Sequence, residues 1–91
     1  MMKLQGKVAL ITGGGTGIGR ALALALAQEG AHLVVTGRRL EPLQEVAKRI
    51  GASGGQVRLM SGDVALAGDA RRMVEECLGA FGRLDVLVNN A

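Results

Sequence analysis

Apolar residues along the chain gather in short unbroken runs separated by polar and glycine-rich stretches. Such runs cover residues 8–11, 33–35 and 86–88, and a weaker strand signal, interrupted by Arg58, covers residues 57–60. An apolar run of this length is typical of a strand that is buried on both faces of a parallel sheet. We therefore expect four strands at these positions.

Between the runs, apolar residues recur three and four positions apart, as they do on one face of a helix. The first such set predicts a helix over about residues 17–29, before Gly30: Ile18, Ala21, Leu22, Ala25 and Leu26. The second set follows the next strand, with Pro42 near its start and Gly51 after it: Leu40, Leu43, Ala47 and Ile50. The third set is the clearest and ends before Gly82: Ala70, Met73, Val74, Cys77, Leu78 and Phe81. Residues 53–55 read as a loop.

Strands and helices therefore alternate from the first element to the last. This order predicts an α/β fold with a doubly wound parallel sheet of four strands and right-handed crossovers. We expect residues 1–91 to form one domain, or a part of one that ends after the fourth strand. In that case the fourth strand has an unpaired edge, and either Val86 and Val88 or Leu87 lack helix cover.

Composition narrows the range of partners. The chain has a net charge of +3, no dense basic run and one aromatic residue, Phe81, which argues against nucleic-acid binding. No apolar run approaches the length of about 18 residues that a membrane span needs. Cys77 is the only cysteine, so no internal disulfide forms, and we expect a cytoplasmic protein. No residues have metal-ligand spacing, and His32 and Cys77 read as structural.

The sequence Thr-Gly-Gly-Gly-Thr-Gly-Ile-Gly at residues 12–19 lies between the first strand and the first helix. The N-terminus of a helix offers free N–H groups and a positive dipole end, which favour an anion such as a pyrophosphate. Glycines in such a turn let the backbone approach the anion closely. A P-loop is excluded, because Arg20 and Ala21 stand where lysine and serine or threonine are needed. The pattern G-x-G-x-x-G also fails, at Ile18 or Arg20.

Three segments together resemble the short-chain dehydrogenase/reductase family over essentially the whole chain. They are the strand and turn from Gly6 to Gly19, the Gly-Asp-Val at residues 62–64, and the Arg-Leu-Asp-Val-Leu-Val-Asn-Asn-Ala at residues 83–91. The resemblance implies a Rossmann-type fold and hydride transfer between a nicotinamide and a carbonyl or alcohol. It also implies a dinucleotide cofactor and a protein that is usually a homo-oligomer.

The resemblance also assigns roles to individual positions. Asp63 takes the adenine amino group with Val64 beside it, Asn90 contacts the adenosine ribose, and Asn89 braces the sheet. The turn surrounds the pyrophosphate and ribose through Gly13, Gly14, Gly15, Thr16, Gly17, Ile18 and Gly19.

The end of the second strand predicts which dinucleotide binds. NAD enzymes of this fold usually place an acidic residue there to bind the ribose 2′-hydroxyl. This chain has Gly37 at that position and Arg38 after it, so we expect Arg38 to bind the 2′-phosphate of NADP. The second position that often carries arginine in the family's NADP enzymes is Thr16 here, and Arg39 reads equally as a second ligand or as a solvated side chain.

No catalytic residue is identified. The family's chemistry uses a serine, a tyrosine and a lysine four residues after it, but this chain contains no tyrosine, and its lysines lie elsewhere. The resemblance covers about the first third of a typical member, without its dimer helices. Two alternatives remain open. One is a stand-alone nucleotide-binding or regulatory module without catalysis. The other is a methyltransferase, which the absence of a carboxylate after the second strand disfavours.

Overall fold

The computed structural model describes residues 3–52 and 54–90, so Ser53 of the predicted loop and Ala91 of the predicted motif lie outside the described residues. Strands and helices alternate in the predicted order. The elements are β1 (Val8–Thr12), α1 (Gly17–Gln28), β2 (His32–Gly37), α2 (Leu40–Ala52), β3 (Val57–Ser61), α3 (Ala67–Phe81) and β4 (Val86–Asn89). Within this part of the chain, none of the helices is both long enough and apolar enough to span a bilayer.

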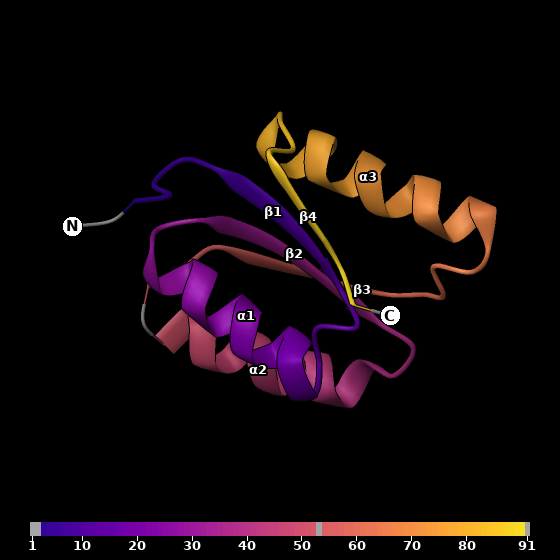
Figure 1. Cartoon of the computed structure of the whole chain (residues 1–91), viewed down its shortest axis with the longest axis horizontal. Helices are drawn as coiled ribbons and strands as arrows, with labels where there is room; N and C mark the ends of the chain where they lie inside the picture. Colours follow the sequence, from indigo (N-terminus) through magenta and orange to yellow (C-terminus); the bar gives the residue numbers. More distant parts are fainter. Residues whose placement is uncertain (1–2, 53, 91) are drawn as a thin grey trace.

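The four strands form one parallel sheet in the order β3-β2-β1-β4. Helices α1 and α2 lie on one face and α3 lies on the other (Figure 1). The predicted α/β fold with a doubly wound parallel sheet is therefore confirmed. All strands point the same way, so the carboxyl ends of β1, β2, β3 and β4 meet at one edge of the sheet.

Strand β1 is buried along its whole length, as its unbroken apolar run predicts. Ala9 and Ile11 belong to the core that α1 and α2 cover, whereas Val8 and Leu10 pack with Cys77 of α3. Because successive side chains point to opposite faces of a strand, one apolar run supplies both cores. Burial raises the pKa of the Cys77 thiol to about 11, so this thiol stays protonated at neutral pH and serves as packing.

The phase of α1 differs from the predicted apolar stripe. Ile18 is 70% exposed and Leu22 is at the surface, while the buried positions are Gly19 and Ala23. The helix is rich in alanine and leucine on every side, so its pattern does not select a face. The buried face of α1 includes Gly19, because only a residue without a side chain fits where the helix meets the carbonyl of Gly13.

Helix α3 begins at Ala67, three residues before the predicted stripe starts. Met73 and Cys77 of that stripe are buried, but Leu78 is 50% exposed. On the same face of the sheet, Leu87 of β4 is 59% exposed, whereas Val86 and Val88 pack against the core under α1 and α2. Of the two possibilities that the sequence leaves for β4, the uncovered side chain is therefore Leu87.

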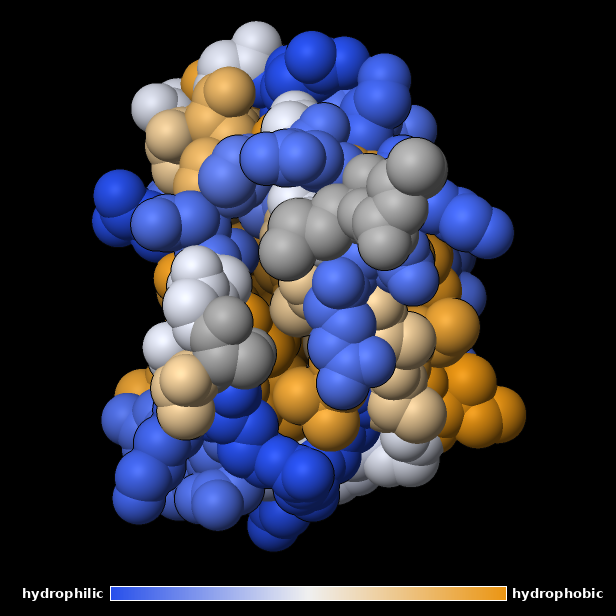
Figure 2. Space-filling view, turned by 90° about the vertical axis from the view of Figure 1, so that its left-hand side faces the viewer, coloured by the Kyte–Doolittle hydropathy of each residue, from blue (hydrophilic) through white to orange (hydrophobic). Residues whose placement is uncertain are grey.

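The strands begin at the other end of the molecule, which presents a mostly hydrophilic surface with apolar residues between (Figure 2). Here Asp85 joins β4 to β1. One oxygen of its carboxylate accepts the N–H of Val8 at 2.9 Å, and the Asp85 N–H donates to the Val8 carbonyl at 2.9 Å. Arg83 binds both carboxylate oxygens, at 2.8 and 2.7 Å. The hydrogen bond from Arg83, and then that from Val8, lower the pKa of Asp85 below its ordinary value.

We predict that Asp85→Asn lowers the melting temperature at pH 7. We also predict that the melting temperature of this variant falls less than that of the wild type when the pH is lowered. A carboxyl whose pKa is lowered by folding contributes stability above its unfolded pKa, and that contribution disappears as the pH falls through the folded pKa. Thermal unfolding measured from pH 2.5 to pH 7 checks this, with the exposed Glu45→Gln on α2 as the control. Superimposable profiles for Asp85→Asn and the wild type would refute the prediction.

Candidate functional site

A cavity of about 650 Å³ opens at the carboxyl ends of the strands. This is the edge at which doubly wound sheets bind their ligands, and the volume lies in the range of ligand sites. Eight of the predicted site residues line it: Gly13, Thr16, Gly17, Ile18, Arg38, Asp63, Val64 and Asn90. Four further residues, for which the sequence predicts no contact with the cofactor, complete the wall: Thr36, Gly37, Gly62 and Ala65. The structure thus brings together residues from four separate segments of the chain.

The remaining predicted residues belong to the turn but not to this wall. Gly15 lines an adjoining pocket of about 320 Å³, together with Arg38 and Arg39. Gly14 donates its N–H to the carbonyl of Thr36 at 3.0 Å, and a Cβ there would collide with the side chain of Val35. A Cβ on Gly19 would collide with the carbonyl of Gly13 and the side-chain amide of Asn90. Gly14 and Gly19 therefore bring the turn close to β2 and β4.

The backbone of the turn requires glycine at two further positions. Gly13 has φ +64° and Gly17 has φ +56°, a left-handed conformation that other residues rarely adopt. These two residues bend the chain out of β1 and into α1. The N-terminus of α1 therefore faces the cavity.

That helix end fits an anion. Thr16 is the N-cap residue and makes no side-chain capping bond, and no acidic residue occupies the first turn of α1, all of which the structure describes. The first N–H groups of a helix have no partner within the helix, so here they remain available to a ligand. Gly19 packs against the carbonyl of Gly13 and the side-chain amide of Asn90, so the first turn of α1 lies close to the preceding turn. The pyrophosphate of a dinucleotide matches these features in charge and in its need for backbone donors.

Thr12 ties the turn to β4. Its hydroxyl oxygen accepts a hydrogen bond from the N–H of Asn90 at 3.0 Å. The hydroxyl donates toward two acceptors, the carbonyl of Val88 at 3.3 Å and the side-chain oxygen of Asn89 at 3.2 Å. The side-chain amide of Asn90 in turn donates to the carbonyl of Gly13 at 3.4 Å. The sequence places Thr12 in the motif, but only the register of β1 with β4 shows what its hydroxyl contacts.

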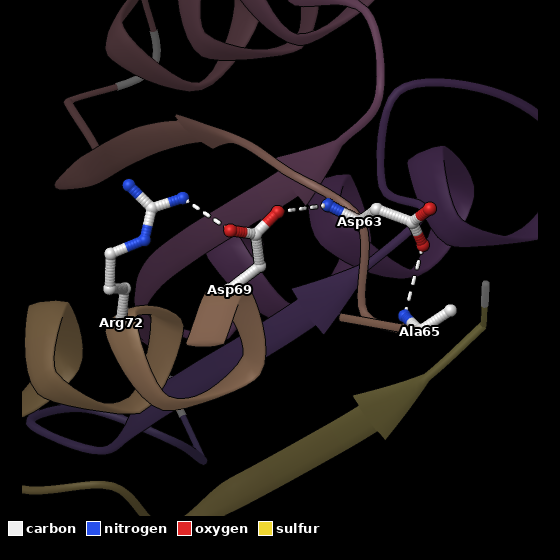
Figure 3. A network of polar contacts seen from close by, with 4 residues as sticks. All are labelled: Asp63, Ala65, Asp69 and Arg72. Carbon is white, nitrogen blue, oxygen red and sulfur yellow. Dashed lines mark hydrogen bonds and ion pairs between the residues drawn. The ribbon is translucent and has the colours of Figure 1, made fainter. Parts of the chain in front are cut away.

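The loop between β3 and α3 forms another part of the cavity wall. The Asp63 N–H donates to the carboxylate of Asp69 at 2.9 Å, and the Asp63 carboxylate accepts the N–H of Ala65 at 2.9 Å (Figure 3). Arg72 donates to the other oxygen of Asp69 at 2.6 Å. The hydrogen bond from Asp63, followed by that from Arg72, lowers the pKa of Asp69. Nothing in the sequence pattern identified Asp69, because an acidic residue in the first turn of a helix is common.

Arg38 lies at the mouth of the cavity and its side chain is 78% exposed. One guanidinium nitrogen lies 3.6 Å from a carboxylate oxygen of Asp63, so the ion pair bridges the ends of β2 and β3. An exposed pair of this length contributes little to stability. Inside the wall, the hydroxyl of Thr36 is buried and has no hydrogen-bond partner among the described residues. The mouth therefore offers an exposed cation, and the wall offers a buried hydroxyl without a partner among the described residues.

Comparison with known proteins identifies the family. The profile of the short chain dehydrogenase family matches residues 7–91. The chain belongs to this family. Its members use NAD(P), and the chain corresponds to their N-terminal, cofactor-binding portion.

Individual relatives match over nearly the whole chain. An uncharacterized oxidoreductase of Mycobacterium tuberculosis is 42% identical over 90 residues, which cover 99% of this chain and 34% of the relative. The 11-beta-hydroxysteroid dehydrogenase-like protein 4A of Arabidopsis thaliana is 47% identical over 90 residues, covering 98% of this chain and 30% of the relative. The chain thus spans about a third of the length of these relatives.

Solved structures confirm the Rossmann-type fold. The L-sorbose reductase of Gluconobacter frateurii, whose crystal contains NADPH and L-sorbose, superposes with a TM-score of 0.93 at 42% identity and covers 99% of this chain and 35% of the reductase. The glucose dehydrogenase of Caenorhabditis elegans, in its apo form, gives a TM-score of 0.93 at 42% identity over 98% of this chain and 39% of the dehydrogenase.

We predict that Gly19→Ala destabilises the chain by about 1–3 kcal/mol, the usual cost of forcing an extra methyl into a packed contact. Gly79→Ala in α3 is the matched control. Its Cβ meets nothing within 4 Å, and removing a helical glycine adds up to about 1 kcal/mol. Urea unfolding of the two variants measures both effects. A Gly19→Ala protein as stable as the wild type would contradict the packing described for the turn.

Proposed function

We propose that the chain binds NADP(H) in the cavity at the carboxyl ends of the strands. In this proposal it forms the cofactor-binding part of an oxidoreductase that transfers a hydride between the nicotinamide and a carbonyl or alcohol. The single observation that carries the choice of NADP is the pair Gly37 and Arg38, which puts a cation and no carboxylate at the end of β2. Family membership supports the reaction class.

Each wall of the cavity suits one part of the dinucleotide. The N-terminus of α1 and the turn from Gly13 to Gly19 would hold the pyrophosphate on backbone N–H groups. Asp63 and Val64 would contact the adenine, and Asn90 would contact the adenosine ribose. Once bound, the nicotinamide supplies or accepts the hydride.

Arg38 would hold the 2′-phosphate of NADP. Its guanidinium is exposed and, within the part of the chain that the structure describes, its ion-pair partner is Asp63 at 3.6 Å. A phosphate therefore competes with a single weak contact. A phosphate accepts two parallel hydrogen bonds from a guanidinium, which makes it the stronger partner. Arg39 lines the adjoining pocket with Gly15 and Arg38, where it would add a second positive charge.

We predict that Arg38→Leu weakens NADPH binding about ten- to a hundredfold and changes NADH binding much less. Hydrogen bonding to a charged group contributes roughly 1.5–3 kcal/mol, and NADH lacks the phosphate that receives it. Fluorescence titration of both cofactors provides the dissociation constants. The control is Arg71→Leu, which removes an exposed arginine of α3 that does not line the cavity.

Two results would contradict this assignment. The first is a wild-type chain that binds NADH as tightly as NADPH. The second is an equal loss of affinity for both cofactors in Arg38→Leu, because the arginine would then contact a group that both cofactors share.

We predict that the purified 91-residue chain binds NADPH but does not reduce carbonyl compounds with it. The chain contains no tyrosine, and the chemistry proposed for the family needs one as general acid. The measurement is NADPH oxidation at 340 nm with a panel of aldehydes and ketones, beside an active short chain dehydrogenase. Turnover above the buffer blank would overturn the prediction.

A further inference from the structure

The loop that carries Asp63 is held by a small number of hydrogen bonds. Gly62 donates its N–H to the carbonyl of Gly37 at 2.9 Å, which continues the pairing of β3 with β2. Leu66 donates its N–H to the carbonyl of Asp63 at 2.9 Å and so closes a turn. Between them the Asp63 N–H points away from the sheet, and the acceptor that it meets is the carboxylate of Asp69.

Asp69 occupies the third position of α3, after its N-cap residue Leu66. An acidic residue at this position usually reaches back to the N–H of the N-cap residue and caps its own helix. Here that N–H is already used, since Leu66 donates to Asp63. The carboxylate of Asp69 reaches three residues further back and binds the loop instead (Figure 3).

Two neighbours fix the direction of this carboxylate. Arg72, one helical turn later, donates to the oxygen that does not face Asp63, at 2.6 Å. On the other side, a Cβ on Gly62 would lie 3.3 Å from Asp69 and 3.0 Å from the side chain of Met73. A Cβ at Gly62 would thus crowd both side chains, and the glycine gives them room beside the loop.

The consequence for Asp63 is a defined orientation. Its backbone is held by Asp69 and one of its carboxylate oxygens by the N–H of Ala65, while the other oxygen faces Arg38 across the mouth of the cavity. Asp63 and Ala65 lie on the loop, and Asp69 lies on α3. The Asp63 side chain, which these contacts orient, belongs to the cavity wall.

We propose that Asp69 is a positioning residue for the cofactor: it holds Asp63 in the orientation in which the Asp63 carboxylate contacts the adenine. This inference rests on the proposed function, because it concerns the adenine end of the same dinucleotide. Asp69 itself does not line the cavity, so it acts only through Asp63.

One test needs no cofactor. Amide hydrogen exchange, followed by NMR on the full chain, should show faster exchange of the Asp63 N–H in Asp69→Ala, because its acceptor is removed. The Gly62 N–H, which is bound within the sheet, is the internal reference and should keep its protection. Unchanged exchange at Asp63 would overturn the inference.

A second test measures NADPH affinity in a double-mutant cycle. Asp69→Ala should raise the dissociation constant about tenfold, the effect of losing one hydrogen bond, whereas in an Asp63→Ala background the same change should alter it less than about twofold. Asp69→Asn keeps an acceptor for the Asp63 N–H and should fall between the wild type and Asp69→Ala. Glu75→Ala makes the matched change at an exposed position of the same helix and should leave the affinity unaltered.

The outcomes separate this inference from the proposed function. A wild-type protein that binds no dinucleotide would overturn both. Binding by the wild type, combined with equal losses from Asp69→Ala in the presence and absence of the Asp63 carboxylate, would overturn the positioning role alone. Melting temperatures of all variants show whether a loss of affinity follows from a loss of folding, which would also count against the positioning role.

Discussion

The complete burial of β1 is the constraint on which the rest of the structure depends. This strand has a hydrogen-bonded neighbour on each side and a helical layer on each face, so all of its side chains must be apolar or internally paired. At its carboxyl end the one polar member, Thr12, meets this requirement by bonding to the end of β4. The same contact places the glycine turn and Asn90 side by side. Strand β1 therefore contributes both to the core and to the placement of residues in the cavity wall.

Much of the fold could be predicted from the sequence because continuous apolar runs, typical of buried strands, alternate with apolar residues at helical spacing. The strands at residues 8–11 and 57–60 differ from the observed β1 and β3 by one residue at the end. The face of α1 could not be predicted, since a helix rich in alanine and leucine buries equally well in several rotations. Its rotation is set by Gly19, a contact between segments that no local pattern reveals.

The candidate site likewise contains residues that could be predicted from the sequence and residues that could not. Arg38 and Asp63 each stand out by residue type and by their position after a strand, and the structure brings them to within 3.6 Å of each other. Thr36 and Asp69 could not be predicted. The importance of Thr36 comes from an unpaired hydroxyl in a buried wall, and that of Asp69 from a bond to a backbone N–H six residues earlier. Both depend on which atoms face each other, which spacing along a chain does not encode.

The walls of the cavity have a mechanical consequence. Asn90 lies at the end of β4 and Gly62 at the end of β3, and these are the two outermost strands of the sheet. A molecule that fills the cavity thus touches both margins of the sheet and the turn between them. Binding energy gained there works against separation of the strands, and a ligand at a hundred times its dissociation constant adds about 2.7 kcal/mol to the free energy of unfolding.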